Sequence, residues 1–62
     1  MITKQHPYRV YLYFNNNFKW CIQDTNDIKY AESSYKLLKA MLDSNYLASN
    51  ITDVKLEVEY DN

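Results

Sequence analysis

Three segments of this sequence alternate apolar and polar residues with a period of two, and this alternation restricts the fold more than any other feature. Every second residue from Tyr8 to Phe14 is apolar or aromatic, and residues 18–23 and 54–60 repeat the pattern. Successive side chains of a β-strand point to opposite faces of a sheet. The period therefore predicts strands at 8–14, 18–23 and 54–60, each with one buried face.

Between the second and third predicted strands, the spacing of the apolar residues changes to three and four. The residues with this spacing are Ile28, Ala31, Tyr35, Leu38 and Leu42. Such spacing places side chains in one stripe along an α-helix, and it predicts a helix at about 27–46. Thr25 or Asn26 is expected to cap its beginning and Asn45 or Asn50 its end, because these residue types satisfy the free backbone groups of helix termini.

A second interpretation keeps the helix from residue 34 onward but changes what precedes it. An extra strand at 28–31 then leads into a helix capped by Ser33 or Ser34, since serine is a favoured N-cap residue. The longer helix is the preferred prediction.

The elements follow one another in the order ββαβ, which predicts a single small α+β domain over residues 1–62. A helix that joins the second strand to the third must cross the sheet, and the simplest arrangement places the third strand beside the first. The expected sheet is three-stranded and antiparallel, with strand order 2-1-3 and the helix packed on one face. We expect the other face to remain uncovered.

Three asparagines at 15–17 form the expected turn between the first two strands. If Phe14 and Phe18 face each other, Asn17 takes a left-handed conformation, which Asn tolerates better than other residues of this glycine-free chain. The cross-strand pairs are then Leu12 with Trp20, Val10 with Ile22, Tyr11 with Cys21, Tyr13 with Lys19 and Arg9 with Gln23. This register predicts that Trp20 packs in the core.

A chain of 62 residues buries little apolar surface, so domains of this size usually need disulfides, a metal or another chain for stability. The single cysteine, Cys21, cannot form an internal disulfide, and with His6 it does not supply the four ligands of a structural zinc site. Association remains, as a homodimer or with a partner protein. No metal or cofactor is expected.

The residue types of common catalytic sites are present but badly placed, so no enzymatic activity is expected. His6 lies outside the hairpin register, which leaves Cys21 without a base in hydrogen-bond reach. Glu57 and Glu59 share the exposed side of a flat strand, where no pocket positions a substrate. The absence of glycine also excludes the phosphate-binding loops of nucleotide-dependent enzymes.

The sequence has no apolar stretch near the ~20 residues that cross a bilayer, so no membrane association is expected. A lone cysteine and the lack of a signal peptide are typical of a protein in a reducing compartment. The expected location is the cytoplasm, that of the host if a phage encodes the chain.

The uncovered sheet face is the predicted working surface. Its candidate binding residues are Arg9, Tyr11, Tyr13, Lys19 and Gln23. Tyrosine and arginine are enriched at protein interfaces because they combine apolar contact area with polar groups that tolerate water. The surface is therefore interpreted first as a protein-binding interface.

Two alternatives use the same face. Residues 1–23 carry Lys4, Arg9 and Lys19 and no acidic residue, and a basic, aromatic sheet face can stack single-stranded bases. Against this, Glu57 and Glu59 on the neighbouring strand repel phosphates. In the second alternative the chain is a structural subunit, and the face is consumed in a homo-oligomer.

The composition is typical of AT-rich coding DNA, with abundant Asn, Lys, Tyr and Ile and no Gly. In length and composition the chain resembles the short accessory proteins of bacteriophages and mobile elements of AT-rich bacteria. Such proteins often bind and block a host factor, including defence nucleases, as anti-CRISPR proteins do. The resemblance implies a non-enzymatic inhibitor of a host protein, and it assigns no role to any single residue.

Overall fold

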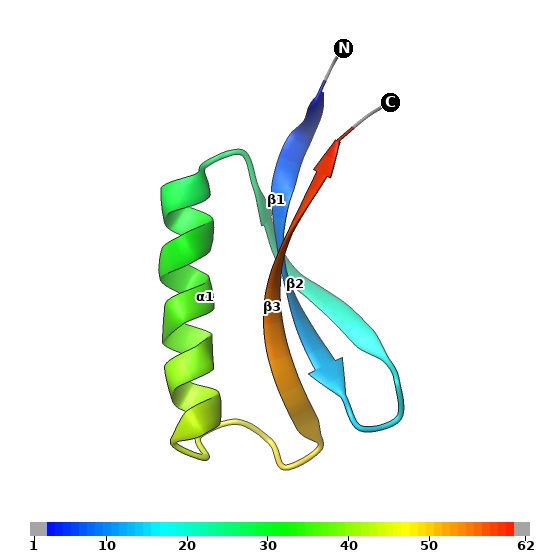
Figure 1. Ribbon diagram of the computed structural model, residues 1–62, viewed down its shortest axis with the longest axis vertical. Coiled ribbons are helices and arrows are strands. Elements are labelled where there is room, and N and C mark those ends of the chain that lie inside the picture. Colours follow the sequence, from blue (N-terminus) through cyan, green and yellow to red (C-terminus); the bar gives the residue numbers. More distant parts are fainter. Residues whose placement is uncertain (1–2, 61–62) are drawn as a thin grey trace.

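The computed structural model describes residues 3–60, with side chains described for residues 6–59, and these residues form three strands and one helix (Figure 1). The elements are β1 (Thr3–Phe14), β2 (Lys19–Thr25), α1 (Ile28–Asp43) and β3 (Ile51–Tyr60). The strands form one antiparallel sheet in the order β2-β1-β3, and α1 lies along one side of it. The predicted α+β class, ββαβ order and strand order are confirmed.

The strands differ in length from the segments that alternate. β1 and β3 begin before the predicted residues 8 and 54, and β2 begins and ends later than the predicted 18–23. Backbone hydrogen bonds continue where the alternation of side chains has stopped, because a sheet ladder depends on main-chain groups.

The turn between β1 and β2 has the predicted geometry. Asn17 adopts a φ of 67°, in the left-handed region. The backbone N–H of Phe14 donates to the carbonyl oxygen of Phe18 at 2.8 Å, and the centres of the two rings are 5.7 Å apart. The three asparagines therefore close the hairpin without glycine.

The predicted register between β1 and β2 is correct near the turn and wrong beyond Cys21. Cys21 pairs with Tyr11 as predicted, and the two predicted pairs nearer the turn also form. A bulge then interrupts the ladder, and Ile22 pairs with no residue of β1. Val10 consequently pairs with Gln23 rather than with Ile22. An extra residue in one strand of an antiparallel pair shifts every later pairing by one position.

The long-helix prediction is confirmed, because α1 begins at Ile28, and the extra strand proposed for 28–31 is absent. The predicted caps, Thr25 and Asn26, are wrong. The side chain of Asp27 accepts hydrogen bonds from the backbone N–H groups of the second and third helical residues, at 3.0 and 3.4 Å. Thr25 instead accepts from the backbone N–H of Asp27, so it positions the capping residue.

α1 ends at Asp43, three residues before the predicted boundary, and Asn45 terminates it as predicted. Asn45 has a φ of 62°, and its N–H donates to the carbonyl of Leu42 at 3.1 Å. The N–H of Tyr46 donates to the carbonyl of Met41 at 2.8 Å. This pair of bonds is a Schellman motif, in which a left-handed residue ends the helix.

The core lies between α1 and the sheet. Val10, Ala31 and Val54 are fully buried there, one each from β1, α1 and β3. The apolar residues packed around them are Tyr8, Leu12, Tyr35, Leu38, Leu42, Leu47 and Leu56. One face of the sheet is therefore covered, as the alternation predicted.

Trp20 does not pack in the core, which corrects the sequence prediction. It pairs with Leu12 as expected, but 60% of its surface is exposed. In Figure 1 the β1–β2 hairpin bends away from α1 toward its tip, as expected for a twisted sheet. The helix consequently covers Val10, in the middle of β1, but does not reach Trp20 near the tip.

Candidate functional site

The sheet surface opposite α1 carries polar and aromatic side chains from all three strands. We call this surface the tyrosine face, and it consists of Arg9, Tyr11, Tyr13, Lys19, Lys55, Glu57 and Glu59. On β1 and β3 these positions alternate with residues of the core, so their side chains point away from it. Lys19 of β2 pairs with Tyr13 and lies on the same side of the sheet. Within residues 3–60, α1 lies along the other side of the sheet and does not cover this face (Figure 1).

Both tyrosines of β1 donate hydrogen bonds to carboxylates of β3. The hydroxyl of Tyr11 donates to Glu59 Oε2 at 3.0 Å, and that of Tyr13 donates to Glu57 Oε2 at 2.5 Å. The bond to Glu57 raises the pKa of Tyr13, because it requires the neutral phenol and because the carboxylate charge repels a phenolate. Tyr13 therefore remains a hydrogen-bond donor over the physiological pH range.

Two of the three cations of the tyrosine face lie beside the same two carboxylates. Arg9 Nη1 is 3.6 Å from Glu59 Oε2, and Lys19 Nζ is 3.6 Å from Glu57 Oε1. The hydrogen bond to Tyr11, together with the charge of Glu59, raises the pKa of Arg9. Burial by itself lowers the pKa of Lys19, but Glu57 and the two tyrosines outweigh it and the net shift is upward.

Two lysines also contact the aromatic rings of the face. Lys19 Nζ lies 4.4 Å from the ring centre of Tyr11, and Lys55 Nζ lies 5.1 Å from that of Tyr13. Tyr11 is enclosed by these neighbours and is only 8% exposed, although no helix covers it. The side chains of the face thus hold one another in place.

Four of the five predicted site residues lie together on the tyrosine face, and Gln23 does not. The bulge at Ile22 turns Gln23 toward α1, where its Nε2 donates to Ser34 Oγ at 2.9 Å. Asp24 takes the predicted place of Gln23 opposite Arg9. The sequence prediction failed here because uninterrupted alternation was assumed along β2.

A second exposed surface was not predicted from the sequence. We call it the apolar strip, and it consists of Phe18, Trp20, Ile22, Tyr30 and Leu37. The bond between Gln23 and Ser34 shows which side of α1 faces β2. Tyr30 and Leu37 lie four residues before and three after Ser34, so they occupy that same side of the helix. The alternation of β2 gave no sign that its apolar residues would stay exposed.

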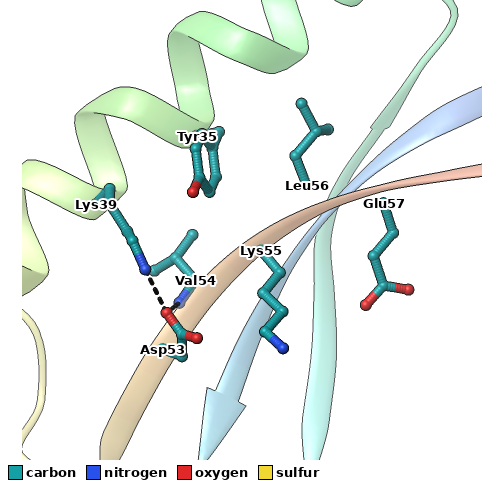
Figure 2. A pocket seen from close by; sticks show the side chains of 7 residues that line it. All are labelled: Tyr35, Lys39, Asp53, Val54, Lys55, Leu56 and Glu57. Carbon is teal, nitrogen blue, oxygen red and sulfur yellow. Dashed lines mark hydrogen bonds and ion pairs between the residues drawn. The ribbon is translucent and has the colours of Figure 1, made fainter.

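The opposite flank, between α1 and β3, carries a groove with a volume of about 450 Å³ (Figure 2). At its rim, Lys39 Nζ lies 2.5 Å from Asp53 Oδ1, which also accepts from the backbone N–H of Val54. The bond to Lys39 lowers the pKa of Asp53, and the same bond raises the pKa of Lys39. Both groups keep their charges near neutral pH, which makes them poor proton-transfer groups there.

Within residues 3–60, α1 is too short and too polar to cross a bilayer. In the same part of the chain, no three His, Cys, Asp or Glu side chains gather closely enough to hold a metal ion. Comparison with known proteins found no matching family model, no matching curated protein and no matching solved structure.

Proposed function

We propose that this chain is a non-enzymatic protein-binding module that uses the tyrosine face to bind and inhibit a larger host protein, such as a defence nuclease. The observation that carries the proposal is the combination of exposure and order on this face. Tyr13 and Arg9 are hydrogen-bonded or ion-paired to β3, yet no described element covers them. Side chains that are already ordered lose little conformational entropy when a partner binds.

The electrostatics of the face support a protein partner rather than a nucleic acid. Of the three cations on this face that could bind a phosphate backbone, Arg9 and Lys19 each lie beside a carboxylate of β3. A phosphate would have to compete with Glu57 and Glu59 for them, and it would be repelled by both. A protein surface can instead match the mixed charges of the face point by point.

The titration behaviour of the face supports binding rather than catalysis. The pKa values of Tyr13 and Lys19 are both raised, away from neutrality. General acids and bases work best when their pKa lies near the operating pH. The assignment of the partner to a host rests on the compositional resemblance to phage and mobile-element accessory proteins.

The test is site-specific photo-cross-linking in a lysate of the host cell. A cross-linking amino acid replaces Lys55, an exposed residue of the tyrosine face, or, as a control, Lys36 on the outer side of α1. We expect one protein to cross-link from position 55 and not from position 36. The charge reversal Arg9→Glu should weaken binding of that protein by about 30-fold or more, as for a hot-spot residue. Equal cross-linking from both positions would contradict the proposal.

Binding of a labelled single-stranded oligonucleotide distinguishes the nucleic-acid alternative from the protein-binding proposal. Phosphate-driven binding weakens steeply between ~50 and ~200 mM salt, whereas a protein contact of mixed polarity changes little. We expect no oligonucleotide binding at either salt concentration. Salt-sensitive oligonucleotide binding that Arg9→Glu abolishes would replace the protein-binding proposal with the nucleic-acid one.

A further inference from the structure

The apolar strip exposes large side chains that globular proteins usually cover. Trp20 is 60% exposed, Leu37 is 62% exposed, and the aromatic rings of Phe18 and Tyr30 are more than half exposed. Scattered apolar residues on a surface are ordinary, but here Trp20 pairs with the core residue Leu12 and so points to the α1 side of the sheet. Tyr30 and Leu37 lie on the side of α1 that faces β2. A flank of this kind marks a contact surface.

The area of the strip can be compared with the needs of a stable interface. A large apolar side chain such as an aromatic one presents 150–250 Å², so the exposed parts of the five residues amount to roughly 400–700 Å². Stable interfaces bury about 800 Å² from each partner, with an apolar centre and a polar rim. The strip therefore supplies about half or more of the area that one partner contributes to such an interface.

The folded chain exposes more surface than a compact chain of its size, and this is an independent reason to expect a partner. Its accessible surface of 4603 Å² exceeds the ~4,250 Å² expected for a compact chain of this mass. Its radius of gyration is 12.4 Å, against ~10.6 Å for a compact domain of this length. Among the described residues, the core between α1 and the sheet has three fully buried members, Val10, Ala31 and Val54, which is a small core.

We propose that the apolar strip is the interface of a two-fold symmetric homodimer. A two-fold axis places a surface against a copy of itself, so the surface must not carry an uncompensated charge. None of the five residues of the strip is charged, and the whole chain has a formal net charge of -1, which gives little repulsion between two copies. In this arrangement Trp20 and Leu37 of each copy lie at the centre of the contact.

This inference goes beyond the proposed function, because it assigns a second surface to a second occupant. The strip belongs to the α1 side of the sheet, whereas the tyrosine face is on the opposite side. One dimer can therefore present two tyrosine faces, and two linked copies of a face bind a repeated partner more tightly than one.

Trp20 is the single tryptophan of the chain, so its fluorescence reports on the proposed interface directly. The experiment follows the Trp20 emission maximum over a dilution series of the whole chain and measures the mass of the same samples by sedimentation equilibrium. We expect a dimer that dissociates on dilution. The Trp20 emission maximum should shift to longer wavelength over the same concentration range in which the measured mass falls.

The matched variants are Leu37→Glu and Lys36→Glu, which introduce an acid at neighbouring positions on different sides of α1. Leu37→Glu should weaken dimerisation by about 30-fold or more, because it places unpaired charges at the centre of the interface. Lys36→Glu should leave it unchanged, and circular dichroism checks that both variants fold. Phe18→Glu is a second test that keeps the Trp20 reporter.

Three results would overturn the inference. They are a monomer at every concentration, a dimer whose Trp20 emission does not change on dilution, and a Leu37→Glu variant that dimerises like the unmodified chain. Failure of the proposed function can be told apart from failure of the dimer, because Tyr13→Ala should abolish partner capture and leave the dimer intact.

Discussion

Replacing Val54 with alanine tests the assigned core, and β3 offers a matched control. Val54 is fully buried between α1 and β1, whereas Val58 lies on the same strand and the same face but is 43% exposed. Val54→Ala removes two buried carbon groups, each worth ~0.8 kcal/mol, and the cavity left behind adds up to about 1 kcal/mol. We expect a loss of about 2 kcal/mol for Val54→Ala and less than about 1 kcal/mol for Val58→Ala.

The assay is urea unfolding followed by circular dichroism, with both variants at one protein concentration, because the proposed dimerisation would make apparent stability depend on concentration. A chain of 62 residues has a total stability of roughly 3–9 kcal/mol, so the loss for Val54→Ala is a large fraction of the whole. The strand propensity of valine and alanine differs equally in both variants, and the comparison therefore isolates burial. Equal losses for the two variants would refute the assigned core.

Three further predictions concern single contacts. Asp27→Ala removes the N-cap of α1 and should lower the free energy of unfolding, measured by thermal unfolding, by about 1 kcal/mol. Asp27→Ser keeps a capping side chain and should lose much less. The lowered pKa of Asp53 means that its bond to Lys39 stabilises the fold at neutral pH and that this contribution is lost as pH falls below 3.8, its ordinary value. Asp53→Asn should thus lower the melting temperature at pH 7 and flatten its fall below pH 4; an unchanged pH profile would contradict this. Glu57→Gln should lower the pH at which the Tyr13 phenol ionises, measured by carbon NMR, because it removes the carboxylate that raises this pKa.

Much of the fold follows from side-chain periodicity, and the errors have a common cause. The alternation from Tyr8 to Phe14 and the helical stripe around Ala31 identified the strands, the helix and the covered face, because both patterns report burial directly. The bulge at Ile22 carries no such signal. A bulge depends on how two strands pair, and the residues of β2 alone do not reveal their partners.

The candidate site was predicted to a similar extent. The prediction placed Arg9, Tyr11 and Tyr13 on one face, because they belong to one strand and alternation alone determines their side. It misplaced Gln23, which lies beyond the bulge. It also placed Trp20 in the core, where the structure does not have it. Periodicity shows the direction in which a side chain points, but it does not show whether a helix reaches far enough to cover that side chain.

The central claim is that the tyrosine face stays open to solvent in the folded protein, including the proposed dimer. Paramagnetic relaxation of side-chain protons by a soluble gadolinium chelate measures this directly. We predict strong relaxation for Lys19 and Lys55 of the tyrosine face and weak relaxation for Leu38 and Ala31 under α1, at protein concentrations where the proposed dimer is expected to form. Protection of Lys19 and Lys55 to the level of Leu38 would contradict the account, because it would mean that self-association consumes the face.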